Sequence, residues 1–308
     1  MARYVLRRVL QTIPVLFFAS VLVFLLIHFL PGDPALALLG DNATQEMIDA
    51  MREKLGLNEP LHIQYLLWIG RVLQGDLGVS VRAAQPVADL IGMKVVATAQ
   101  LVTAAFGLAV LISFPLGTLG ALKPHSWLDR FVMAYSSLAV ALPNYFLGII
   151  LVLLFAVRLG WLPASGYVPV SQDPQAFLRF LVLPTITLAA GLSAVQMRFV
   201  RSALMEVLSE DYVRTARAKG LTERGVVWSH AMKNALISVI TILGLQFGAL
   251  LTGSVLVETL FGWPGMGRLL ITAITQRDYA MVQANILFLL IIFTVANLAV
   301  DVSYGLLD

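Results

Sequence analysis

Residues 209–225 read SEDYVRTARAKGLTERG, a dense polar stretch inside a chain that is otherwise rich in apolar runs. Seven of these 17 residues are charged, whereas only 13% of the 308 residues of the chain are. Ser209 is a suitable N-cap, because its hydroxyl can accept an unpaired N–H of a first helical turn. Glu210 and Asp211 suit the positive end of a helix dipole, and Gly220 can adopt the left-handed conformation that ends a helix. The stretch therefore predicts a short helix from Glu210 to Lys219.

The predicted helix needs something to pack against, because an isolated helix of about ten residues is only marginally stable in water. Arg214 and Arg217 follow its acidic start, and Ala216 offers the small side chain that a close-fitting surface requires. Thr222 can cap a second helix that runs through Trp228 towards the next apolar run. A solvated basic connector would account for the charge but not for these caps. From the residues alone, a partner-docking element and a solvated connector both stay open.

The composition places this stretch in a membrane protein. The chain is 59% hydrophobic and 13% charged, with a mean hydropathy of +0.85, whereas soluble domains are about 45–50% apolar and about 25% charged. The net charge of +3 suits a membrane protein with basic loops better than a nucleic-acid binder. The absence of cysteine excludes disulfides, Cys-ligated zinc, Fe–S clusters and thiol catalysis.

A membrane-spanning helix needs about 20 apolar residues, and the runs predict one all-α membrane domain with six spans. The first run could instead be a signal peptide, but its 22 residues exceed the usual apolar region of about 7–15, so we expect a retained span. The predicted spans are 9–30, 95–122, 131–157, 180–197, 235–257 and 281–300.

Basic residues predict the orientation, because short cytoplasmic loops are enriched in Lys and Arg. With the N-terminus inside, the inner segments hold 12 of the 21 Lys and Arg residues and the short outer segments hold four. The other five lie in the long outer segment 31–94, which carries little weight in this rule. We therefore expect both termini, and the loop 198–234 that contains the polar stretch, in the cytoplasm.

The outer segment 31–94 has helix signals of its own and reads as a small folded lip. Thr44 is a good N-cap and Gly56 a good C-cap for the residues between them. Residues 62–73 place apolar side chains at helical spacing. The pattern predicts two short helices on the outer face.

A family resemblance emerges from residues 210–237, EDYVRTARAKGLTERGVVWSHAMKNALI. They resemble the cytoplasmic EAA loop of permease subunits of binding-protein-dependent ABC importers, in particular the dipeptide, oligopeptide, glutathione and nickel branch. Arg214, Thr215 and Ala216 stand where that loop ideally has Glu-Ala-Ala, and Gly220 stands at its glycine. Arg214 thus replaces the Glu. Four further stretches resemble the same branch: HFLPGDPA (28–35), GDLGVSV (75–81), FGWPGMGRLL (261–270) and QRDYAMVQA (276–284).

The resemblance implies a type I ABC importer permease of the bacterial inner membrane. Its loop helix would be a coupling helix that seats in a cytoplasmic ATPase subunit. Implied partners are a second homologous permease, two ATPases that bind ATP and Mg, and an extracytoplasmic substrate-binding protein. Because the lip is long and contains acidic residues, we expect it to form part of the docking surface for the binding protein, although it could instead only stiffen the bundle. The residues assigned to coupling on this basis are Ser209, Glu210, Asp211, Arg214, Thr215, Ala216, Arg217 and Gly220.

The chain shows no signature of an enzyme. No lysine follows a glycine, so no Walker A motif is present. The four histidines are scattered without a His-Glu-x-x-His pair, and no Gly-x-Ser-x-Gly occurs. We therefore expect no catalytic residue, no metal site and no cofactor in this chain.

An ion-coupled carrier is the alternative from another class, but carriers of that kind usually have ionisable residues within their spans. The polar residues within the predicted spans are mostly neutral. Asn144, Gln246 and Asn285 are candidates to line a translocation path, although each could simply form an interhelical hydrogen bond. We expect half of a path for short peptides, with nickel-chelate import as the alternative within the family.

Overall fold

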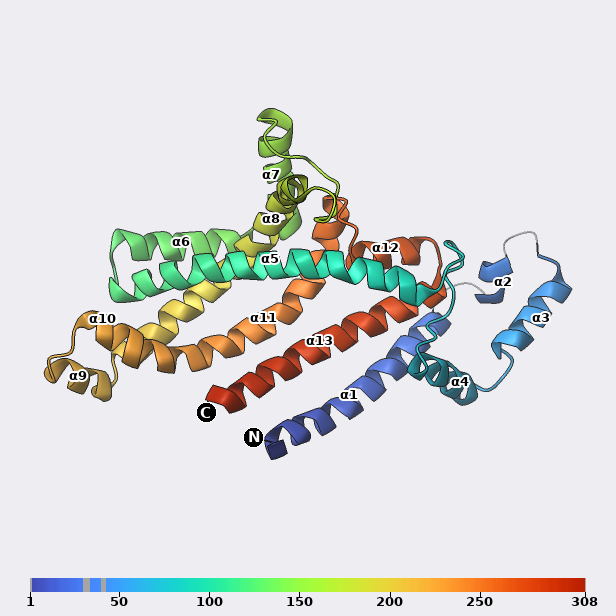
Figure 1. Ribbon diagram of the computed structural model, residues 1–308, viewed down its shortest axis with the longest axis horizontal. Coiled ribbons are helices and arrows are strands. Elements are labelled where there is room, and N and C mark those ends of the chain that lie inside the picture. The colour runs from blue at the N-terminus through green and yellow to red at the C-terminus, as the bar shows by residue number, and fades with distance from the viewer. Residues whose placement is uncertain (1, 30–33, 40–42, 308) are drawn as a thin grey trace. The chain divides into compact units, whose positions relative to one another are not determined.

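The computed structural model describes residues 2–29, 34–39 and 43–307 (Figure 1). Within these ranges the chain is all-α, with one isolated antiparallel bridge between Val79 and Pro86. The elements are α1 (Ala2–Phe29), α2 (Pro34–Leu39), α3 (Gln45–Leu55), α4 (Leu61–Leu73), α5 (Val87–Leu122), α6 (Trp127–Ala141), α7 (Asn144–Leu151), the π-helical η1 (Val152–Arg158), α8 (Pro174–Leu208), α9 (Asp211–Ala218), α10 (Glu223–Gly225), the π-helical η2 (Val226–Ala231), α11 (Met232–Leu260), α12 (Met266–Thr275) and α13 (Tyr279–Leu307).

Among the described residues, five helical segments are long and apolar enough to cross a membrane, which confirms the predicted class. They are Leu6–Leu26, Val87–Leu122, Pro174–Leu208, Glu223–Leu260 and Tyr279–Leu298. Each covers most of a predicted span. The second begins at Val87, so the last residues of the predicted lip are the first turns of α5. Residue 30 of the first predicted span, and residues 30–33 of the HFLPGDPA motif, lie outside the described residues.

The third predicted span, 131–157, is not one straight helix. α6 and α7 with η1 are bent by 100° at Leu142 and Pro143, and they make a sixth span only if the bent pair crosses as one. Leu142 is extended, with ψ 122°. A residue before proline avoids the helical region, and proline itself donates no backbone hydrogen bond. The helix therefore stops at this dipeptide and restarts from Pro143.

The chain divides into two compact units, and residues 98–263 with 296–308 make up most of the first. Its centre is α8, which packs against α6, α7 and α11. Polar contacts join α8 to its neighbours: Ser113 on α5 donates to Gln196 (3.0 Å), and the hydroxyl groups of Tyr135 and Ser193 lie 2.8 Å apart. At Gly117, a Cβ would lie 2.8 Å from the Met197 carbonyl oxygen. Only glycine permits this close approach of α5 to α8.

The second unit contains residues 2–97 and 264–295. Its core joins the start of α5 (Val87, Ile91) to Met266 of α12 and Met281 of α13. The buried Asp278 carboxylate accepts the Ser80 hydroxyl and the Met281 N–H. These bonds fasten the loop before α5 to the start of α13.

Both helices predicted within segment 31–94 are present. α3 begins after Thr44, whose hydroxyl accepts the Met47 N–H (3.4 Å), and ends at Gly56, which has φ +71°. α4 begins at Leu61 and packs against α1. Cap chemistry was sufficient to place α3, whereas α4 was predicted from the helical spacing of its apolar residues and its N-cap, Pro60, makes no side-chain cap bond.

Candidate functional site

The predicted polar helix exists as α9, but it starts one residue later than expected. Ser209 is not its N-cap: it ends α8, with helical φ −85° and ψ −12°, and its hydroxyl donates to the Glu206 carbonyl (2.6 Å). Glu210 occupies the N-cap position in extended conformation, without a side-chain cap bond. The reason is that α8 extends to Leu208, beyond the apolar run that predicted its length.

The end of α9 agrees with the prediction. Lys219 is the C-cap, and Gly220 follows with φ +81° and donates its N–H to the Arg217 carbonyl (2.9 Å). A Cβ at Gly220 would meet nothing within 4 Å. The backbone conformation, rather than crowding within the chain, is therefore what favours glycine here.

The inner face of α9 packs on its own chain. Val213 and Ala216 are buried against Val226 of η2, with Val207 and Leu208 of α8 beside them. The Tyr212 hydroxyl accepts a hydrogen bond from Asn234 Nδ2 (2.7 Å). These contacts supply the support that a helix this short needs, and they tie α9 to the end of α8 and the start of α11.

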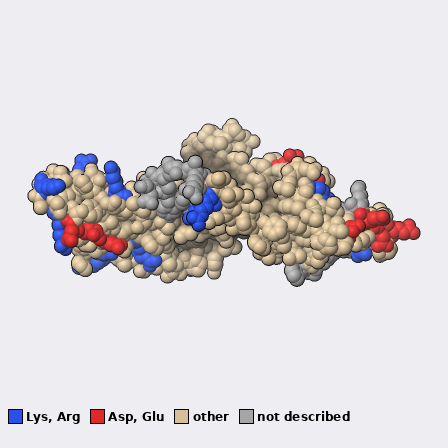
Figure 2. All heavy atoms as spheres, turned by 90° about the horizontal axis from the view of Figure 1, so that it is seen from below, with Lys and Arg blue, Asp and Glu red and all other residues tan. Residues whose placement is uncertain are grey.

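The outer face of α9 is polar and exposed. The exposed residues include Asp211, Arg214, Thr215 and Arg217. Arg214 pairs with Asp211 (3.2 Å), and Arg217 pairs with Glu223 (2.8 Å). Figure 2 shows basic and acidic side chains gathered over the α9–α10 segment. Such exposed pairs add at most about 1 kcal/mol of stability, so their main effect is to orient the charges.

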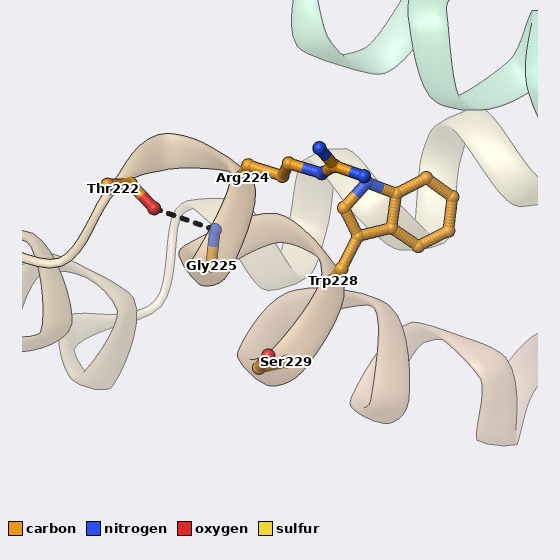
Figure 3. A pocket seen from close by; sticks show the side chains of 5 residues that line it. All are labelled: Thr222, Arg224, Gly225, Trp228 and Ser229. Atoms are coloured by element: carbon orange, nitrogen blue, oxygen red, sulfur yellow. Dashed lines mark hydrogen bonds between the residues drawn. The ribbon is translucent and has the colours of Figure 1, made fainter.

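A shallow hollow of about 530 Å³ lies beside the turn that follows α9 (Figure 3). Thr222 accepts the Gly225 N–H (3.3 Å), which confirms it as the cap of α10. The Arg224 and Trp228 side chains extend to the same side of the segment, and Trp228 is 57% exposed. No sequence pattern predicted this hollow. The lining residues are Thr222, Arg224, Gly225, Trp228 and Ser229.

A buried ion pair holds the helix that leads into α9. Arg201 of α8 donates from Nε and Nη2 to the two carboxylate oxygens of Asp129 in the first turn of α6. Asp129 also accepts the His125 N–H (2.9 Å). The Asp129 side chain is 6% exposed and that of Arg201 is 19% exposed. Sequence reasoning missed this pair, which joins residues 72 positions apart.

The three predicted path residues have different surroundings. Asn144, half-buried at the start of α7, faces Gly191 of α8: its Oδ1 lies 3.2 Å from where a Cβ of that glycine would stand. Gln246 is half-buried on α11, and its buried Oε1 receives no hydrogen bond from the described residues. Asn285 is fully buried in the other compact unit and donates to the Met266 carbonyl (3.1 Å). Asn144 and Gln246 therefore belong to one compact unit and Asn285 to the other.

Glu258 lies one residue beyond the fifth predicted span. It is fully buried on α11, and its carboxylate accepts the Thr98 hydroxyl (2.7 Å). Tyr167, from the segment between η1 and α8, donates to Gln100 (3.2 Å), and its ring packs edge-on against the buried Trp263. The sequence did not predict these contacts, because they join residues far apart in the chain.

Solved structures share this fold. An inward-facing form of the MetNI methionine ABC transporter matches with a TM-score of 0.59 at 18% identity, covering 71% of this chain and 96% of that one. An amino acid ABC transporter crystallised with histidines gives 0.51 at 17% identity, covering 71% and 92%. Both similarities concern the fold alone.

Sequence comparison extends over the whole chain. Glutathione transport system permease protein GsiC of Escherichia coli strain K12 is 42% identical over 308 residues, covering 100% of this chain and 98% of that protein. The protein of the same name from Escherichia coli O6:H1 is 43% identical over the same shares. Residues 113–308 match the family model of the binding-protein-dependent transport system inner membrane component, and residues 1–103 match its N-terminal companion. This chain therefore belongs to the family of binding-protein-dependent transport system inner membrane components, the multi-pass permease subunits of bacterial ABC importers.

Proposed function

We propose that this chain forms half of the translocation path of an ATP-driven importer for short peptides of the glutathione type. The observation that carries the proposal is the 42–43% identity over the full chain to permeases named for glutathione transport. The other half would come from a second homologous permease. A binding protein outside the membrane would deliver the substrate.

We propose that α9 is the coupling helix and that two cytoplasmic ATPases bind the ATP and Mg. Support comes from its two-sided construction: Val213 and Ala216 face the chain, while Arg214, Thr215 and Arg217 face outward. The exposed Trp228 and the hollow beside it extend the outward surface. This orientation requires loop 198–234 and both termini in the cytoplasm, as the basic residues predict.

The packing of α9 suggests how force would pass into the spans. α9 contacts η2, whose helix continues into α11, and it lies against the last residues of α8. The Tyr212–Asn234 bond adds a polar link. A partner that displaces α9 would therefore move α8 and α11 with it. Nucleotide binding would bias a permease with two conformations towards one of them.

Uptake by the complete importer in proteoliposomes tests the proposal. ATP is supplied on the cytoplasmic face of the importer, in the vesicle lumen, and the binding protein on the outer face. We then expect uptake of radiolabelled glutathione, and we expect unlabelled short peptides to inhibit this uptake. Uptake of a nickel chelate but not of peptides would overturn the substrate and leave the class intact. Uptake by this chain alone, driven by an ion gradient without ATP, would overturn the class.

A further inference from the structure

The lip helix α4 has an apolar face that no described part of the chain covers. None of its residues is fully buried, and its four leucines are all exposed by half or more: Leu61 50%, Leu66 63%, Leu67 51% and Leu73 81%. Leu66 and Leu73 stand seven residues apart and so share one face of the helix. An exposed apolar face such as that of Leu66 and Leu73 favours a partner other than water.

The opposite face of α4 fixes its depth along α1. The Tyr65 hydroxyl lies 2.8 Å from the buried Ser20 hydroxyl, and the Trp68 and Phe24 ring centres are 5.8 Å apart. Ser20 lies within the spanning segment Leu6–Leu26, six residues before its end. At 1.5 Å per residue, that is about 9 Å inside the apolar segment. α4 therefore contacts α1 at a level that lies within the membrane.

Three polar side chains of α4 suit that level, whereas His62, at the start of the helix, is exposed. Gln64 donates to the carbonyl groups of Leu57 (3.0 Å) and Glu59 (2.7 Å), and Tyr65 is satisfied by Ser20. Arg71 stands in the last turn, where a long side chain can reach the headgroups. Tyr and Trp are the residues enriched at membrane interfaces.

We infer that α4 lies in the outer leaflet of the bilayer, with Leu66 and Leu73 against lipid acyl chains. Interfacial helices bury their apolar face about 5–10 Å into the boundary between headgroups and acyl chains, which agrees with the depth of Tyr65. On α1, Phe18 and Leu22 are likewise exposed, at 65% and 64%. In this arrangement the two lip helices have different surroundings: α4 contacts lipid, and the charged helix α3 contacts water.

Spin labels test this placement directly, and the chain has no native cysteine to remove. Leu66→Cys and Leu73→Cys would be labelled in the complete importer, reconstituted in vesicles of phosphatidylethanolamine and phosphatidylglycerol. Faster relaxation of a spin label by oxygen indicates that the label lies in lipid. Faster relaxation by a water-soluble nickel chelate indicates that it lies in water. Met47→Cys on α3, 52% exposed, is the matched water control, and Phe18→Cys on α1 is the lipid control.

We expect both α4 labels to respond as Phe18→Cys does, with oxygen access several-fold above nickel access and the opposite ratio at Met47→Cys. Nickel access at Leu66→Cys equal to that at Met47→Cys would place α4 in water and overturn the inference. Low access to both reagents would place another protein over α4 and overturn it as well. None of these outcomes depends on what the importer carries.

Discussion

Arg201 donates two hydrogen bonds to the Asp129 carboxylate, and this contact joins α8 to the first turn of α6. Both side chains are largely buried. The carboxylate completes the arrangement by accepting the His125 N–H. The pair therefore connects the turn between α5 and α6 to the helix that leads into α9.

Asp129→Asn tests how much this contact stabilises the permease. The substitution keeps the shape of the side chain but leaves the Arg201 charge without a carboxylate, and removing one partner of a buried pair typically costs about 3–5 kcal/mol. Because Arg201 is partly exposed, we expect the lower end of this range, measured as a lower midpoint of thermal unfolding of the detergent-purified importer. The control is Asp211→Asn, which removes the exposed partner of Arg214 and should shift the midpoint little. Equal shifts for the two variants would contradict the prediction.

Gly220→Asp tests the coupling role of α9. A side chain at φ +81° strains the turn, and replacement of glycine at a positive φ costs on the order of 1 kcal/mol. That cost is too small to prevent membrane insertion. We therefore expect normal expression and normal binding-protein docking, but sharply reduced uptake and reduced co-purification of the ATPases.

Gly220→Asn separates backbone strain from the added charge. Asparagine has a similar size, is neutral and tolerates the left-handed region better than most residues, so we expect intermediate uptake. Wild-type uptake and wild-type ATPase retention in Gly220→Asp would show that residues 209–225 are a solvated connector.

Topology reporters test the proposed orientation. Fusions at Lys123 and Gly220 should report the cytoplasm, because their segments hold the short-loop excess of basic residues. Fusions at Asn58 and Asp173 should report the outer side. An outer signal at Gly220 would be incompatible with contact between α9 and a cytoplasmic ATPase.

Removal of residues 44–56 tests whether α3 helps to dock the binding protein. α3 is a charged helix with its own caps, so we expect the truncated chain to insert while stimulation of ATPase activity by the binding protein falls. A milder variant replaces Glu46 and Asp49 with Gln and Asn. If stimulation stays at the wild-type level in both, the lip only stiffens the permease.

Local chemistry was enough to predict the helix ends at Thr44, Gly56, Gly220 and Thr222, because each cap depends on neighbouring residues alone. The assignment of Ser209 failed for the same reason: a local rule cannot tell that the preceding helix already uses that residue. Contacts between distant positions were beyond such rules. Arg201 meets Asp129 across 72 positions, and Ser80 meets Asp278 across 198.

The third span shows why proline alone does not predict a break. Pro14, Pro115 and Pro184 all lie inside continuous helices, whereas the helix stops before Pro143. Neighbouring helices can satisfy the backbone groups that a proline frees. Which of the four prolines breaks its helix is thus decided by packing that the sequence does not display.

The break at Pro143 also depends on Gly191 of α8, although no hydrogen bond between these two residues is seen among the described contacts. The Asn144 side chain and the Ala139 carbonyl oxygen, on either side of the break, both face Gly191 of α8, at 3.2 and 3.9 Å from where a Cβ would stand. A larger residue at 191 would have to push the restarted helix away. We therefore expect the bend and the glycine to be inherited as a pair, so that permeases with a larger residue at 191 would also have a straighter third span.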